Sequence, residues 1–272
     1  MDSDHRVVQN AGVNLAVECG GEGSTVVLLH GFACDRSLWD ACVASLESRH
    51  RVIRYDLRGH GESSSPESRF SVADHVKDLA TVLDAFGEFG PVHLVGHSLG
   101  SAVATSFCVE SPERCESLSL VAPMLAGYRW GTDWIERIQA LREAFLRGDL
   151  ASGLDAHWLS GEHFERSRMH ESWDAARSMV MRWKGAPLVE PVCAETAFDE
   201  EERIRRILVP VLVMSGAQDH EDLLEVAYLL TTRIPGGSME LFEDCGHLLP
   251  LESPERFLPV LLQFLEDGGA EY

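Results

Sequence analysis

The sequence lacks the apolar runs that membrane insertion requires. No stretch approaches the roughly 20 consecutive apolar residues of a membrane-spanning helix. Residues 1–21 also contain no apolar run of the length found in a signal peptide. We therefore predict a protein with no membrane association and a cytoplasmic location.

Basic residues and paired cysteines are also scarce. Only 23 Lys and Arg stand against 44 Asp and Glu, a formal net charge of −21 that disfavours binding to nucleic acids or anionic lipids. The seven cysteines are scattered without a C-x-x-C pair, which favours reduced thiols over a disulfide framework.

Four polar residues of the middle segment could suggest a metal site, namely His157, Glu162, His163 and His170. Their spacing matches no tight ligand pattern, so we predict no metal and interpret them as a solvated helical face.

Apolar runs alternate with helical patterns along most of the chain. Runs typical of strands occupy 13–18, 25–29, 51–55, 92–95, 118–121, 209–214 and 239–242. Helical spacing covers 38–46, 72–86, 99–109 and 254–265. This alternation predicts an α/β fold, with a mostly parallel sheet and helices on both faces. Ligands of such sheets bind beyond the carboxyl ends of the strands.

The middle of the chain breaks this rhythm. From Pro123 to Arg206 no buried-strand run occurs, and the segment has the pattern of several helices with polar joints. Five of the six tryptophans lie there. We predict one core domain formed by 1–122 and 207–272, with residues 123–206 inserted as a helical lid.

A G-x-S-x-G pattern, Gly96-His97-Ser98-Leu99-Gly100, lies between an apolar strand and a helix. A sharp strand-to-helix turn exposes a serine hydroxyl above the sheet, and flanking glycines remove Cβ clashes. A serine needs such exposure, and a nearby base, to act as a nucleophile. Ser98 is the predicted nucleophile.

The predicted oxyanion site combines two backbone N–H groups. His30-Gly31-Phe32 follows the strand at 25–29, so the Phe32 N–H can point at a developing oxyanion together with the Leu99 N–H. We interpret His30 as a structural hydrogen-bonding residue. Cys34 and Cys245, near the same site, are expected to be small buried residues.

The base and its acid are expected after the last two strands. His247 directly follows the strand at 239–242, and Asp219 follows the strand at 209–214. An aspartate there would orient the imidazole and stabilise the imidazolium. The competing candidates for the acid are two near neighbours of Asp219 and one of His247, namely Glu221, Asp222 and Asp244.

Four segments resemble the α/β-hydrolase fold family, in its esterase and 3-oxoadipate enol-lactonase branch. They are HGFACDRSLWD, RYDLRGHGES, GAQD and DCGHLLPLESPERF, and the resemblance spans nearly the whole chain. It implies a helical lid and no cofactor. Within the second segment, Asp56 and Arg58 are expected to pin a turn by charge-assisted hydrogen bonds.

These features predict a cofactor-free serine hydrolase for a carboxylic ester or lactone of a small molecule. The aromatic lid predicts a partly apolar pocket, for which the candidate residues are Met124, Trp130, Trp134, Trp158 and Phe164. Two alternatives remain open. One is non-hydrolytic or C–C bond chemistry in a biosynthetic pathway by a cyclase, acyltransferase or C–C hydrolase, and the other is a slow-turnover small-molecule receptor.

Overall fold

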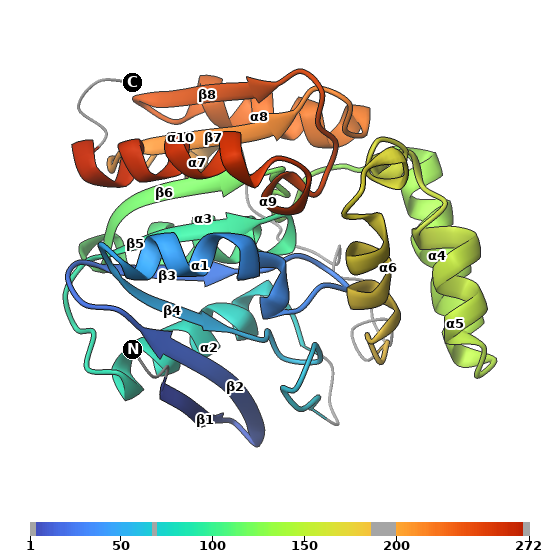
Figure 1. Ribbon diagram of the computed structural model, residues 1–272, viewed down its shortest axis with the longest axis horizontal. Helices are drawn as coiled ribbons and strands as arrows, with labels where there is room; N and C mark the ends of the chain where they lie inside the picture. The colour runs from blue at the N-terminus through green and yellow to red at the C-terminus, as the bar shows by residue number, and fades with distance from the viewer. Residues whose placement is uncertain (1–3, 67–69, 186–199, 269–272) are drawn as a thin grey trace.

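A computed structural model describes residues 4–66, 70–185 and 200–268. An eight-stranded sheet runs through the molecule in the order β1-β2-β4-β3-β5-β6-β7-β8 (Figure 1). Its strands are β1 (Asp4–Asn10), β2 (Val13–Gly20), β3 (Thr25–Leu29), β4 (Arg51–Tyr55), β5 (Val92–His97), β6 (Cys115–Val121), β7 (Val211–Gly216) and β8 (Gly237–Phe242).

The sheet is parallel from β4 to β8, and β2 is antiparallel to both of its neighbours. Every residue of β3 and β5 is buried, as expected for continuous apolar strands covered on both faces. The edge strand β1 is mostly exposed and has no such run, which explains why the sequence did not predict it.

Helices cover both faces of this sheet, as predicted. Helix α1 (Asp40–Glu47) contacts α10 (Pro254–Asp267) and α9 (Leu249–Glu252) on one face. On the other face, α2 (Val72–Ala85) contacts α3 (Leu99–Glu110), and α7 (Glu200–Ile204) contacts both α3 and α8 (Glu221–Arg233) (Figure 1). Short 3₁₀ turns precede α1 and β6, namely η1 (Arg36–Trp39) and η2 (Pro112–Arg114).

Helix α8 is missing from the prediction above although its pattern is present. Its buried residues Leu223, Val226, Ala227 and Leu230 follow the helical spacing i, i+3, i+4 and i+7. Acidic residues in its first turn also favour a helix start.

Beyond the carboxyl ends of the strands lies the helical insertion between β6 and β7 (Figure 1). It comprises α4 (Thr132–Leu146), α5 (Leu150–Gly153), the π-helical turn η3 (Leu154–Trp158), the 3₁₀ turns η4 (Glu162–Phe164) and η5 (Ser167–Met169), and α6 (Trp173–Met181). Residues 186–199 of the predicted lid lie outside the described residues. The lid boundaries at 123 and 206 stay a prediction, and α7 lies against core helices.

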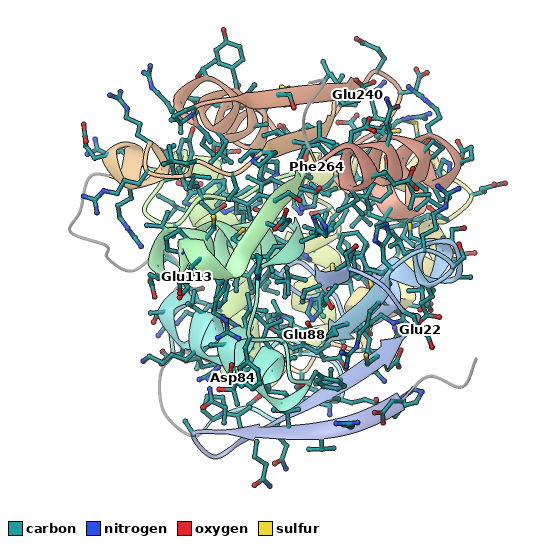
Figure 2. All side chains as sticks on the ribbon, turned by 90° about the vertical axis from the view of Figure 1, so that its left-hand side faces the viewer. Glu22, Asp84, Glu88, Glu113, Glu240 and Phe264 are labelled. Atoms are coloured by element: carbon teal, nitrogen blue, oxygen red, sulfur yellow. The ribbon has the colours of Figure 1, made fainter. Side chains whose placement is uncertain are left out.

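Several acidic side chains lie at the end of the molecule opposite the lid. Figure 2 faces this end, with the labelled Glu22, Asp84, Glu88, Glu113 and Glu240 around it. Two of these acids are paired with arginines, Asp84 with Arg114 and Glu88 with Arg51. Within the described ranges, no helix is long and apolar enough to cross a membrane.

Candidate active site

Ser98 occupies a strained turn between β5 and α3. Its φ of 50° and ψ of −115° are unusual for a residue with a side chain. Its N–H donates to the Val121 carbonyl at 2.9 Å, which holds the turn against the neighbouring strand. A Cβ at Gly100 would lie 2.3 Å from the Leu29 carbonyl oxygen, and one at Gly96 would lie 2.4 Å from the Gly100 carbonyl oxygen. Only glycines allow the helix to start this close to the sheet.

The structure brings Asp219 and His247 together. Nδ1 of His247 lies 2.8 Å from Oδ2 of Asp219, and both side chains are almost fully buried. Because a carboxylate can only accept, the proton of this bond is on Nδ1, which leaves Nε2 as the nitrogen that faces other partners. The two loops are joined by a hydrogen bond from the Gln218 N–H to the Cys245 carbonyl at 2.9 Å, since β7 and β8 are adjacent parallel strands.

The competing acids are placed elsewhere. Asp222 accepts a hydrogen bond from the Gly131 N–H at 2.9 Å and so holds the start of the lid. Glu221 and Asp244 are exposed. Of the four acids considered, Asp219 is the one hydrogen-bonded to the candidate base.

The candidate base lies beside the serine turn. The ring of His97, which precedes Ser98, is 4.8 Å from the ring of His247 between centroids. Nε2 of His97 donates to the His247 carbonyl oxygen at 2.8 Å. Burial, together with the nearby His247, holds the pKa of His97 well below its ordinary value, so this ring is a neutral support.

The loop after β3 passes directly over the same turn. A Cβ at Gly31 would lie 3.1 Å from the Ser98 Cβ. The loop is shaped by a positive φ of 57° at Ala33 and a turn from the Cys34 N–H to the Gly31 carbonyl at 3.2 Å. Within the described ranges, no acceptor takes the N–H of Phe32 or that of Leu99, the first residue of α3.

His30 is a structural residue, as interpreted from the sequence. Its Nδ1 donates to the Gly31 carbonyl at 2.8 Å, and its Nε2 accepts from the Leu57 N–H at 2.9 Å. Complete burial lowers the pKa of His30 to about 4, which keeps the ring neutral. This ring links the ends of β3 and β4 beneath the site.

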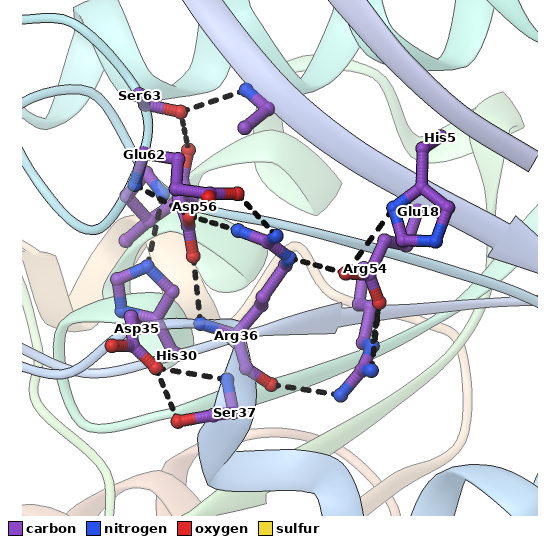
Figure 3. Close-up of polar contacts among 12 residues, drawn as sticks. His5, Glu18, His30, Asp35, Arg36, Ser37, Arg54, Asp56, Glu62 and Ser63 are labelled. Atoms are coloured by element: carbon purple, nitrogen blue, oxygen red, sulfur yellow. Dashed lines mark hydrogen bonds and ion pairs between the residues drawn. The ribbon is translucent and has the colours of Figure 1, made fainter. Parts of the chain in front are cut away.

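The turn after β4 is pinned by ion pairs, as predicted (Figure 3). Asp56 accepts from the N–H groups of Arg36 and Glu62, each at 2.8 Å, and also pairs with the Arg36 guanidinium. Arg58 makes two bonds of 2.6 Å to the Asp78 carboxylate. Both pairs are charge-assisted and largely buried, so they fix the turn rather than react.

Three of the five predicted pocket residues lie at the site. The Trp158 ring is 5.0 Å from the Phe32 ring, and the Phe164 ring is 6.1 Å from that of His247. The Met124 N–H is 3.3 Å from the Ser98 carbonyl oxygen.

The other two predicted pocket residues, Trp130 and Trp134, extend the aromatic cluster into the lid. Their rings stack at 5.0 Å, and Trp134 lies 5.7 Å from Trp158. Trp183, which was not assigned to the pocket, packs 4.6 Å from Phe32. Lid aromatics therefore surround the side chain of the candidate oxyanion residue.

Glu252 is a site residue that the sequence interpretation missed. Its carboxylate accepts from the N–H of Gly246 at 2.6 Å and of Leu248 at 3.0 Å, on either side of His247. It also accepts from the hydroxyl of Ser167 in the lid. The only signal in the sequence is an acid a few residues after the histidine, at the end of a short helix.

The interpretation of the lid histidines as a solvated face is wrong for His163, which has no exposed surface. Polarity alone assigns these four residues to a solvated face, and polarity does not distinguish a buried histidine from an exposed one. Cys34 and Cys245 are buried as expected, and burial raises the pKa of both thiols. The cysteines in the described ranges are free, and Cys193 lies outside them.

In the described part of the chain, ligand-type atoms of Asp133, His220 and Asp222 lie within 4.8 Å of one another. Both nitrogens of His220 are engaged, since Nδ1 accepts from the Asp222 N–H at 3.2 Å and Nε2 donates to Asp133 at 3.0 Å. The cluster ties lid helix α4 to the residue after Asp219.

A strand-end serine turn, a histidine–carboxylate pair from adjacent strands and a helical lid define a hydrolase of the α/β class. Residues 26–260 match the model of the alpha/beta hydrolase family, and the chain belongs to this family.

Several proteins resemble the chain along nearly its full length. It is 25% identical to 3-oxoadipate enol-lactonase 1 of Acinetobacter baylyi, covering 96% of each chain. It is 27% identical to carboxylesterase YbfK of Bacillus subtilis, over 91% of this chain and 82% of that one. A thermophilic esterase from Thermogutta terrifontis has the same fold, with a TM-score of 0.84, 24% identity and coverage of 99% and 100%.

Proposed function

We propose that this protein is a serine hydrolase that cleaves a carboxylic ester or lactone of a small, partly apolar substrate. The observation that carries this proposal is the 2.8 Å bond between His247 and Asp219, held beside the strained turn of Ser98. The carboxylesterase and enol-lactonase among the relatives support ester and lactone chemistry.

In the proposed reaction, Nε2 of His247 takes the proton of the Ser98 hydroxyl as its oxygen attacks the substrate carbonyl. The tetrahedral intermediate collapses, and His247 protonates the leaving oxygen to release the alcohol. His247 then deprotonates a water molecule, which attacks the acyl-serine. When this second tetrahedral intermediate collapses, His247 returns the proton to the Ser98 oxygen and the carboxylic acid is released. Asp219 keeps the imidazole in the required tautomer and stabilises the imidazolium. No step requires a cofactor.

The N–H groups of Phe32 and Leu99 are assigned to the oxyanion. Their positions beside Ser98 and their lack of other acceptors within the described ranges support this role. Each such donor is typically worth about 3 kcal/mol of barrier lowering. The aromatic faces around Phe32 support a substrate with an apolar part.

The direct experiment combines covalent labelling with turnover. Wild-type protein should react with a fluorophosphonate probe, carry the adduct on Ser98 by peptide mass spectrometry, and hydrolyse p-nitrophenyl butanoate. Ser98→Ala should lose both labelling and turnover. Labelling that survives in Ser98→Ala would move the nucleophile elsewhere. A stable acyl adduct without turnover would contradict hydrolysis.

A further inference from the structure

His163 is a buried imidazole whose hydrogen-bonding capacity is unused. Neither ring nitrogen has a partner among the described residues, and the side chain has no exposed surface. Its ring is enclosed by Phe164 at 4.3 Å, Trp158 at 4.5 Å and Trp134 at 5.2 Å between centroids. Burial keeps its pKa well below the ordinary value, so the ring is neutral and offers one donor and one acceptor.

The fold alone gives no reason for a histidine at this position. Burying polar atoms without partners lowers stability, and a phenylalanine of similar shape would fill the same aromatic enclosure without that cost. Buried His30 and His220 have hydrogen bonds on both nitrogens. His50, His60, His75 and His97 each have one buried nitrogen without a partner. Among the described residues, His163 is the histidine with both nitrogens buried and unpaired, and a bound molecule would supply the missing partner.

The location of His163 identifies which part of a substrate it would meet. Its ring is 5.8 Å from that of His247 and perpendicular to it. Trp158, in contact with His163, also packs on Phe32, whose N–H is assigned to the oxyanion. In the proposed reaction His247 protonates the leaving oxygen, so the substrate atoms nearest to it belong to the alcohol part of the ester.

We propose that His163 is a substrate-binding residue that hydrogen-bonds a hydroxyl group on the alcohol part of the ester. The preferred substrates would then be monoesters of diols or polyols, or lactones with a hydroxyl near the ring oxygen. A hydroxyl both donates and accepts, so it suits a neutral imidazole in either tautomer. This inference rests on the proposed acyl transfer at Ser98, because the ester must react there.

The test compares two esters of equal size that differ in a single group. Values of kcat/KM are measured for 2-hydroxyethyl butanoate and propyl butanoate by pH-stat, each divided by the rate of alkaline hydrolysis of the same ester. We expect wild-type protein to favour the hydroxyethyl ester about tenfold, the value of one hydrogen bond. In His163→Phe this ratio should fall to about one. His163→Gln, which keeps a donor and an acceptor, should restore part of the preference.

A matched control places the same substitution on the half-buried His157, a lid residue outside the aromatic enclosure. His157→Phe should keep the wild-type ratio. The melting temperature gives a second measurement that does not depend on activity. His163→Phe should melt higher than wild type, because it removes two buried unpaired polar atoms. A melting temperature lowered in both His163→Phe and the less bulky His163→Leu, so that overpacking by the phenyl ring is not the cause, would show a structural role and overturn the inference.

The outcomes separate this inference from the proposed function. If both esters react through Ser98 and His163→Phe keeps the wild-type ratio, the role of His163 is wrong and the hydrolase stands. If neither ester shows turnover that depends on Ser98, the proposed function fails, and the inference fails with it.

Discussion

Replacing Gly31 by alanine should damage catalysis much more than folding. The new Cβ would lie 2.6 Å from Nδ1 of His97 and 3.1 Å from the Cβ of Ser98. Ordinary contacts need about 3.5 Å, so the loop must move by about 0.9 Å. His97 cannot rotate away, because it is fully buried and bonded to the His247 carbonyl. The displacement therefore falls on the Gly31–Phe32 backbone.

The size of the effect follows from that displacement. A shift of about 1 Å in a positioning group can cost about 100-fold in rate, and complete loss of an oxyanion donor costs about 100- to 1,000-fold. We expect kcat on p-nitrophenyl butanoate to fall about 100-fold in Gly31→Ala, with a much smaller change in KM. Overpacking should lower the free energy of unfolding by about 1 to 3 kcal/mol, so the protein remains folded.

Gly90→Ala is the matched control, because nothing lies within 4 Å of a Cβ there. It should keep the activity and melting temperature of wild type. A folded Gly31→Ala protein, checked by circular dichroism, that retains kcat within threefold of wild type would refute the reasoning. The loop after β3 would then lie too far from the reacting carbonyl to supply an oxyanion donor.

Asp219→Asn should lower kcat about 1,000-fold or more, because an amide can favour the wrong tautomer of His247. Asp222→Asn, whose carboxylate bonds to Gly131 instead, should change kcat less than tenfold. Steady-state kinetics on p-nitrophenyl butanoate measure both effects. Glu252→Gln should lower kcat about tenfold and the melting temperature by several degrees, because one amide oxygen cannot accept from the N–H groups of both Gly246 and Leu248. An unchanged kcat would contradict the positioning role of Glu252. The Asp35–Arg182 pair joins the core to the lid. Burial opposes ionisation of Asp35, but hydrogen bonds from Ser37 and Arg182 outweigh it and lower its pKa below the ordinary 3.8. Because the pKa of Asp35 is lower in the folded than in the unfolded protein, the pair should stabilise the fold above about pH 4 and lose this effect on further acidification. Asp35→Asn should therefore lower the free energy of unfolding by about 1 kcal/mol at pH 7 and by almost nothing near pH 2. Urea denaturation at both pH values measures the difference.

The local sequence determined the parts of this protein that depend on neighbouring residues. The continuous apolar run of β3 predicted a strand covered on both faces, and its bounds agree with the structure. The glycines around Ser98 predicted a tight strand-to-helix turn, because a Cβ there would collide with backbone atoms. Strands and tight turns of this kind depend on a few consecutive residues, so a single sequence is enough to predict them.

Only the tertiary structure decided which side chains meet. The sequence left Asp219 to compete with Glu221, Asp222 and Asp244, and the pairing of β7 with β8 decides which of them faces His247. The burial of His163 likewise depends on contacts between lid and core. Glu252 follows the same rule, since its role depends on how a loop folds back around its carboxylate. These contacts join residues through space, and their distances are set by sheet register and lid packing, which no local pattern encodes.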